Sequence, residues 1–156
     1  MKKPKLTDLL IFIVSAELAG AFSALISGGQ FSEYYNTLVK PPIAPPGWVF
    51  PVTWVILYAL MGTAAYIVSL SDSMLRPLAL KLYGAQLAVN VIWSPIFFGS
   101  RSFAGAAVTA VLLLILVTAM ELVFFRISEN AAFIALPYLI WTAYAAYLSF
   151  GFLVLN

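Results

Sequence analysis

Polar and aromatic side chains interrupt the apolar stretches of this chain at helical spacing. Gln86, Asn90, Trp93 and Phe97 follow one another at intervals of three or four residues, which places them on one face of a helix. Amide groups inside an apolar helix need hydrogen-bond partners, and the polar surroundings of a buried cavity supply them. Aromatic faces with a few polar groups at their edges are the chemistry of a pocket for a flat, apolar molecule.

Two further stretches carry aromatic side chains at helical spacing. Trp54 and Tyr58 share one face of the stretch 48–70, and Tyr138, Trp141 and Ala145 share one side of the stretch 130–154. Such stripes more often belong to a core or to a lipid-facing belt than to a ligand site, so spacing alone does not identify a pocket. Trp48 is expected at the mouth of its helix, near the membrane interface.

Glu17 is a single carboxylate near the middle of the first apolar stretch. A carboxylate at mid-bilayer is costly and normally faces the protein interior. Two interpretations remain open: a contact with a proton or substrate, and a neutral carboxyl group that is hydrogen-bonded inside the bundle. Ala16, Gly20 and Ala24 recur every four residues and predict the close approach of another helix. Together these features favour, as one alternative, a small transporter subunit.

The composition excludes several kinds of chemistry. The sequence contains no cysteine and no histidine, so it can form neither a disulfide nor the usual ligand sets of zinc and haem iron. No metal site is therefore expected. No paired carboxylates suggest acid–base catalysis. The net charge of +2 is too small to indicate a nucleic-acid partner.

The apolar content predicts that the chain lies in a lipid bilayer. Hydrophobic residues make up 63% of the 156 residues and the mean hydropathy is +1.02, more than a soluble domain of this size can bury. The apolar runs are continuous, which favours helices over a barrel. We therefore predict an all-α membrane protein, in which residues 1–156 form one domain with five transmembrane helices at about 7–27, 48–70, 78–99, 103–125 and 130–154.

The loop predicted at 28–47 joins the first two of these helices. It contains Pro41, Pro42, Pro45 and Pro46, each of which fixes φ and removes a backbone donor. Such a loop is stiff and can cover a cavity at low entropic cost, although it can also be a connector that only spaces two helices. Farther along, Pro95 is expected to kink the third helix near its end.

Three blocks of this sequence resemble the TspO/MBR family, the tryptophan-rich sensory proteins and translocator proteins. The blocks are K-P-P-I-A-P-P-G-W with the following W, L-Y and M-G at 40–62, Q-L-x-x-N-x-x-W-S-x-x-F-F-G-x-R at 86–101, and L-P-Y-L-I-W-T-A-Y-A-A-Y-L at 136–148. Their order and spacing match the family pattern. At one position the chain departs from it, because Ile43 stands where the family usually has tryptophan.

The resemblance implies five transmembrane helices around a pocket that the first loop covers. It also implies binding of porphyrins such as protoporphyrin IX and haem, with no cofactor required, and of isoquinoline-type or benzodiazepine-type ligands. Carried onto matching positions, the ligand-binding residues would be Tyr35, Pro45, Trp54, Tyr58, Asn90, Trp93, Trp141 and Ala145. Ile43 would weaken stacking from the loop. Sterol binding is not carried over, since no basic residue follows the aromatic residues at the C-terminus.

Three functions compete on this evidence. The first is a membrane protein that binds tetrapyrroles as a sensor, carrier or regulator. The second is an enzyme that degrades porphyrin in a reaction that depends on light and oxygen, with Trp54 and Trp141 as candidate catalytic residues. The third is the transporter subunit that Glu17 suggests. Binding is favoured, because the sequence shows no acid–base or nucleophilic constellation.

Charge and small residues also predict orientation and assembly. With five helices, one side of the membrane would carry Lys2, Lys3, Lys5, Arg76, Lys81 and Arg126, and the other side only Lys40 and Arg101. The positive-inside rule then places the N-terminus in the cytoplasm of a bacterium, in a plasma-membrane protein, with an outer membrane as the alternative. The resemblance implies a homodimer through the third helix, where Gly84 and Ala88 offer a surface for close approach.

Overall fold

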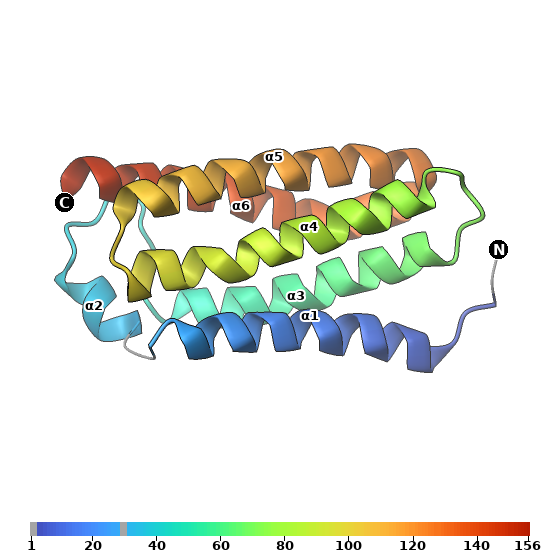
Figure 1. The fold of residues 1–156 in the computed structure, drawn as a ribbon, viewed down its shortest axis with the longest axis horizontal. Coiled ribbons are helices and arrows are strands. Elements are labelled where there is room, and N and C mark those ends of the chain that lie inside the picture. Colours follow the sequence, from blue (N-terminus) through green and yellow to red (C-terminus); the bar gives the residue numbers. More distant parts are fainter. Residues whose placement is uncertain (1–2, 29–30) are drawn as a thin grey trace.

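The computed structural model describes residues 3–28 and 31–156, and these form a bundle of long helices (Figure 1). Lys2 and residues 29–30 of the loop lie outside the described residues. Five helices are long and apolar enough to cross a membrane, which confirms the predicted all-α membrane fold. They are α1 (Leu6–Ile26), α3 (Val49–Ser69), α4 (Arg76–Ser94) with its continuation η1 (Pro95–Gly99), α5 (Phe103–Ile127) and α6 (Glu129–Leu155).

The observed helix bounds differ from the expected ones by at most two residues, and capping serines mark the starts of α5 and α6. Ser102 precedes α5, and its hydroxyl accepts a hydrogen bond from the backbone N–H of Gly105 at 3.2 Å. Ser128 ends α5 and begins α6, accepting a bond from the N–H of Ala131 at 3.3 Å. These serines satisfy backbone donors that the first helical turn leaves free.

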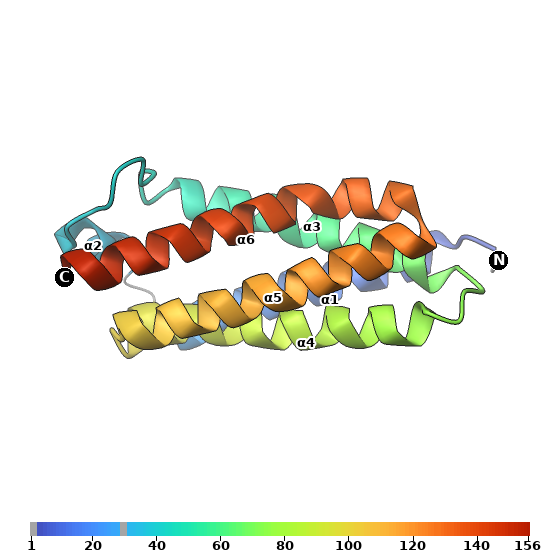
Figure 2. The ribbon, with the colours of Figure 1, turned by 90° about the horizontal axis from the view of Figure 1, so that it is seen from above.

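The helices run along the long axis of the molecule (Figures 1 and 2), and their contacts close a ring. Helix α1 contacts α3 and α4, α6 contacts α3 and α5, and α5 also contacts α4. The N-terminus lies at one end of the bundle, whereas the C-terminus and the short helix α2 (Phe31–Thr37) lie at the other. We call the latter end the loop end.

Glycine allows α1 and α3 to approach closely. A Cβ atom built on Gly62 of α3 would lie 2.9 Å from the carbonyl oxygen of Phe12 in α1, and a Cβ on Gly20 would overlap the ring of Tyr58. Ala16 beside Gly20 is fully buried. Ala16 and Gly20 of the small-residue stripe on α1 therefore pack inside the subunit against α3, whereas Ala24, one turn on, is exposed.

The covering segment differs from the loop expected at 28–47, because it contains the helix α2. The remainder is fastened to α6: the hydroxyl of Tyr144 donates to the carbonyl of Ile43 at 2.6 Å, and that of Tyr147 donates to the carbonyl of Pro42 at 2.9 Å. Ile43 has φ of 61°, which is unfavourable for a β-branched residue. The two hydroxyls hold the backbone on either side of this strained position.

A second set of contacts fixes the start of the proline segment. The side chain of Asn156 at the C-terminus accepts a hydrogen bond from the N–H of Val39 at 2.9 Å and donates one to its carbonyl at 3.0 Å. Pro41 is buried against Gly151 of α6, where an added Cβ would lie 2.5 Å from the Pro41 ring. The proline segment is thus docked on α6 by hydrogen bonds and by close packing.

The expected irregularity at Pro95 takes the form of a π-helical turn. The ring of Pro95 cannot donate to the α-helical ladder, and the N–H of Ser100 donates to the Pro95 carbonyl at 2.8 Å, the five-residue spacing of a π-helix. This turn places Phe97 and Phe98 one after the other beside Trp93.

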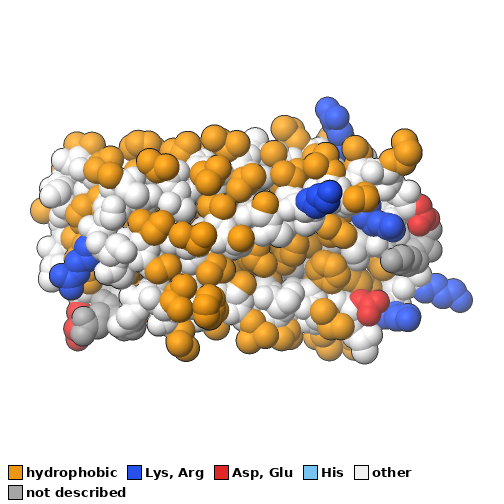
Figure 3. Space-filling view, viewed as in Figure 1, with side chains coloured by type: hydrophobic (Ala, Val, Ile, Leu, Met, Phe, Trp, Pro, Cys, Tyr) orange, Lys and Arg blue, Asp and Glu red, His pale blue; other side chains and the backbone are white. Residues whose placement is uncertain are grey.

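Apolar side chains cover much of the face of the bundle seen in Figure 3, and most Lys and Arg side chains lie near the end that holds the N-terminus. Large side chains such as Leu25 and Val154 are about 80% exposed. A surface of this kind matches lipid rather than water, because apolar area is costly to hydrate.

Candidate ligand-binding site

A cavity of about 550 Å³ lies between α1, α3 and α4, at the part of the bundle that α2 and the loop cover. Its wall on α1 is made of small residues, Gly20, Ala21 and Ala24. Its other walls are made largely of aromatic rings from α2, α3, α4 and η1. A space of this size and lining is typical of a pocket for a small apolar ligand.

The aromatic walls are held by contacts with one another. The rings of Trp54 and Tyr58 lie with their centroids 5.5 Å apart, and Trp93 stacks on Phe97 at 5.2 Å. Near the loop end, Phe31 of α2 meets Phe98 edge to face at 4.9 Å. Offset and edge-to-face pairs of this kind are favourable, so the walls present fixed ring surfaces.

A buried polar network anchors the side of the cavity at mid-bundle. The hydroxyl of Tyr58 donates to Oδ1 of Asn90 at 2.9 Å, and Nδ2 of Asn90 donates to the hydroxyl of Tyr138 at 2.8 Å. Tyr138 in turn donates to Oε1 of Gln86 at 2.5 Å. The network joins α3, α4 and α6 and accounts for the amide side chains that the sequence places in an apolar helix.

The cover contributes Tyr35 of α2 to the cavity wall. This side chain is 2% exposed, and its hydroxyl donates to the carbonyl of Pro45 at 2.6 Å. Burial, with a smaller contribution from Tyr144, raises the pKa of Tyr35 to about 12, so the phenol keeps the proton that it donates. The Nζ atom of Lys40 lies 5.0 Å from the centre of the Tyr35 ring. The loop and the cavity wall are therefore one connected unit.

The structure brings together five of the residues proposed for the site: Tyr35, Trp54, Tyr58, Asn90 and Trp93 all line the cavity. The other three lie elsewhere. Pro45 supports the cover through its carbonyl, and Ala145 lines only small voids between α6 and its neighbours.

Trp141 faces a separate groove on the outside of α3 and α6. Its ring meets that of Trp54 at 6.5 Å, nearly perpendicular, and its indole N–H is buried without a hydrogen-bond partner among the described residues. Trp141 is therefore the neighbour of a cavity residue and does not itself line the cavity.

Several lining residues are not among the ligand-binding positions that the family resemblance implied, although Glu17 was considered as a possible substrate or proton contact. Trp48 stands at the mouth of α3 as expected, 69% exposed, but it also lines the cavity. Glu17 lines it too, on the same face of α1 as Gly20 and Ala24. Their spacing of three to four residues is a signal that could have placed Glu17 with the small residues on one face.

The fourth spanning helix, α5, also carries an acidic side chain that the sequence analysis did not single out. Thr109 and Thr118 donate hydrogen bonds to their own helix, whereas Glu121 is 9% exposed and its Oε2 atom has no partner in the described part of the chain. Glu121 does not line the cavity.

The site offers no set of metal ligands. Among the described residues, no three His, Cys, Asp or Glu side chains gather in one place. The hydroxyls of Tyr35 and Tyr58, which face the cavity, are already hydrogen-bonded to Pro45 and Asn90. A tetrapyrrole in this cavity would be held by contacts with its faces and edges, whether or not it carried iron.

Comparison with known proteins agrees with the helices and the motifs. The model of the TspO/MBR family matches residues 11–155. Protein CrtK of Rhodobacter capsulatus is 37% identical over 97% of this chain and 94% of its own length. The tryptophan-rich sensory protein of Cereibacter sphaeroides is 40% identical over 96% of this chain and 93% of its own length. The translocator protein of Bos taurus is 33% identical over 89% and 84%, respectively. This chain is an integral membrane protein that belongs to the TspO/MBR family.

Proposed function

We propose that this protein binds tetrapyrroles such as protoporphyrin IX and haem, or similar flat apolar molecules, and acts as a sensor, carrier or regulator of them. The observation that carries the proposal is the cavity of about 550 Å³ between α1, α3 and α4, with aromatic rings on most walls and small residues on the remaining one. A flat ring system can lie against the small residues of α1 and meet aromatic rings on its other sides.

A substitution that fills the cavity tests this proposal. Ala24→Phe places a ring in the space beside Trp93 and Trp54, so saturable binding of protoporphyrin IX to the purified protein should be lost. Leu25→Phe is the matched control, because Leu25 is the next residue on α1, is 80% exposed and does not line the cavity. Binding is followed by porphyrin fluorescence in detergent. Equal affinity in the two variants would show that the ligand binds elsewhere.

The contact between Trp54 and Trp141 favours a second candidate function, degradation of bound porphyrin with light and with dioxygen as the oxidant. Trp54 can touch a bound ligand directly, and Trp141 touches Trp54 with ring centroids 6.5 Å apart. The test is the rate of light-driven porphyrin loss per bound molecule in Trp54→Phe and Trp141→Phe. An unchanged rate per bound porphyrin in both variants would rule out degradation by these tryptophans and leave porphyrin binding as the proposed function.

We also propose that the N-terminus lies in the cytoplasm of a bacterium and that the loop end faces outward across the plasma membrane. Near the end of the bundle that holds the N-terminus, α4 carries Arg76 and Lys81 and the last turn of α5 carries Arg126, in addition to the basic N-terminal segment. Lys40 and Arg101 lie near the loop end. A reporter fused at Asn156 should be active only outside the cytoplasm. Cytoplasmic activity would reverse the orientation.

The expected homodimer through α4 remains a proposal supported by an open surface. No atom lies within 4 Å of a Cβ built on Gly84, and Ala88 one turn on is exposed as well. A second helix can approach closely at such a surface. The double variant Gly84→Leu/Ala88→Leu should be monomeric in mild detergent, and an unchanged dimer would place the interface elsewhere.

A further inference from the structure

Glu17 is the only residue with a formal charge among those that line the cavity in the described part of the chain. Apart from the indole N–H groups of Trp48 and Trp54, the other polar side chains of the wall are engaged within the protein. Ser23 donates to the carbonyl of Val91 at 2.8 Å, and the indole N–H of Trp93 donates to Ser149 at 3.3 Å. The hydroxyls of Tyr35 and Tyr58 likewise donate hydrogen bonds, to the carbonyl of Pro45 and to Oδ1 of Asn90.

The carboxylate of Glu17, in contrast, has no hydrogen-bond or ion-pair partner among the described residues. It is half-buried in the middle of α1, where lipid surrounds the bundle. A charged group in this position is costly unless a partner compensates it, and such residues within a membrane are usually functional. The remaining candidate for a partner is a molecule in the cavity.

The position of Glu17 defines one end of the cavity. It is the lining residue of α1 farthest from the loop end, about 10 Å along the helix from Ala24 at 1.5 Å per residue. Tyr58 and Asn90, the corresponding residues of α3 and α4, form the same closed end. We call this the deep end of the cavity.

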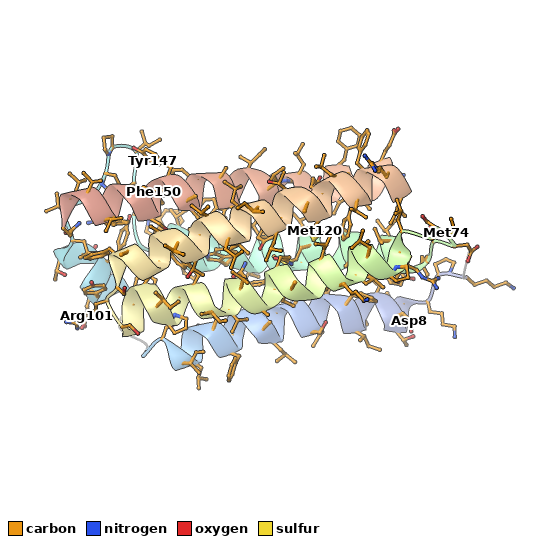
Figure 4. The ribbon with its side chains drawn as sticks, turned by 45° about the horizontal axis from the view of Figure 1, so that its top comes forward. Asp8, Met74, Arg101, Met120, Tyr147 and Phe150 are labelled. Atoms are coloured by element: carbon orange, nitrogen blue, oxygen red, sulfur yellow. The ribbon has the colours of Figure 1, made fainter. Side chains whose placement is uncertain are left out.

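Two basic side chains lie at the other end of the cavity, near the segment that covers it. Lys40 stands over the ring of Tyr35, which lines the cavity, and the guanidinium of Arg101 stands 4.8 Å from the ring centre of Tyr34 on α2. Figure 4 shows Arg101 at the loop end, far from Asp8 at the other end of the bundle. The cavity thus has its only carboxyl group among the described residues at its deep end, with basic side chains close to its cover.

We propose that Glu17 is a specificity-determining contact at the deep end, where its carboxylate accepts a hydrogen bond from a cationic or N–H-donating group of the ligand and repels a ligand carboxylate. The inference deepens the proposed function by naming which edge of a ligand goes where. A porphyrin with two carboxylates would bind with these toward Lys40 and Arg101, and its apolar edge would lie toward Glu17. A flat aromatic cation would place its charge at Glu17.

Replacement of Glu17 by glutamine tests the proposal, because the size is kept and the charge is removed. The probes are acridine orange, a flat aromatic cation, and the dimethyl ester of protoporphyrin IX, which is neutral at its edges. Loss of a charge-assisted hydrogen bond should weaken binding of acridine orange about tenfold. Binding of the ester should change by less than about twofold, because no full charge is lost from that complex.

Two further variants separate a ligand contact from a general effect on the fold. Glu17→Asp keeps the charge and should retain most of the affinity for acridine orange. Asp8→Asn removes a carboxylate from the first turn of the same helix, outside the cavity, and should change neither affinity. Thermal unfolding in detergent identifies any variant that has not folded. If Glu17→Gln has not folded, the affinity of Glu17→Asp for acridine orange is compared with that of the unmodified protein instead.

The proposal is overturned if Glu17→Gln leaves the affinity for acridine orange unchanged, if it weakens both probes equally, or if the unmodified protein does not bind the cation. Its failure is distinguishable from failure of the proposed function. Acridine orange reports on Glu17 even if no porphyrin binds, whereas the Ala24→Phe variant reports on porphyrin binding even if charge at the deep end has no effect.

Discussion

One side of the helix bundle has a filled interior, whereas the other contains a cavity. Where α5 meets α6 and α4, the interior is filled by side chains such as Val117, Met120 and Phe124, none of which is exposed at all. Where α1 faces α3 and α4, a cavity of about 550 Å³ remains. We call these the solid side and the hollow side. They are built from similarly apolar helices, so hydrophobicity alone does not decide which one fills.

The difference lies in the size of the facing residues and in what holds them. On the hollow side, α1 presents Gly20, Ala21 and Ala24, which leave space opposite the rings of the other helices. Those rings cannot move inward, because Tyr58 is hydrogen-bonded to Asn90 and Trp93 to Ser149. A cavity therefore persists where small residues face large side chains that polar contacts hold in place.

The largest expected effect is a loss of folding stability when a residue of the solid side is truncated. Phe124→Ala should lower the free energy of unfolding by about 3–5 kcal/mol, because it leaves a void among fully packed side chains. Phe125→Ala is the matched control, since Phe125 is 54% exposed toward lipid. Thermal unfolding in detergent measures both. Equal melting temperatures would mean that the solid side is not as tightly packed as the structure shows.

The polar network around Asn90 should contribute both to stability and to porphyrin affinity. The variant Asn90→Leu removes its hydrogen bonds. The Tyr58 hydroxyl loses its acceptor in a buried place, which costs about 1–3 kcal/mol of stability. Porphyrin affinity should fall as well, because the Tyr58 ring is no longer held at the deep end. Asn130→Leu, at an exposed position in the first turn of α6, serves as the control in both measurements. Lost stability with normal affinity would separate the network from the site.

The docking of the loop on α6 is tested with a pair of glycines. Gly151→Val forces a branched side chain against the ring of Pro41 and should cost about 1–3 kcal/mol, displacing the cover and speeding porphyrin release. Gly84→Val makes the same substitution in another helix, with no atom of the same subunit within 4 Å of the new Cβ, and at a surface that we propose for the dimer contact rather than near the cover. Stopped-flow measurement of the dissociation rate should distinguish them, and identical rates would show that the cover does not retain the ligand.

The smallest expected effect distinguishes two neighbouring tryptophans, one that lines the cavity and one that lies outside it. Trp54→Phe removes part of a ring that lines the cavity and should weaken porphyrin binding several-fold, about 1 kcal/mol. Trp141→Phe alters a residue that meets the rings of Trp54 and Phe50 from outside the cavity, so it should have less effect on affinity. Titration of the two variants side by side tests the boundary of the site. A greater loss in Trp141→Phe would extend the site toward α6.

The sequence by itself determined the number and approximate bounds of the spanning helices, because continuous apolar runs broken by proline, serine and glycine leave few other arrangements in lipid. It also determined the face on which Asn90 and Trp93 lie, since helical spacing fixes which side chains point the same way. The motifs identified the family. The short helix α2 escaped prediction because it has only seven residues, too few to show a period.

Only the tertiary structure decided which neighbour each face meets. Trp54 and Trp141 both belong to aromatic stripes, yet α3 turns Trp54 into the cavity while α6 turns Trp141 toward a groove on the outside. The spacing that groups Glu17 with Gly20 and Ala24 likewise could not say what lies opposite them. Periodicity assigns a residue to one face of its own helix. A binding site, however, forms between helices, and the packing of the five spanning helices determines which faces meet.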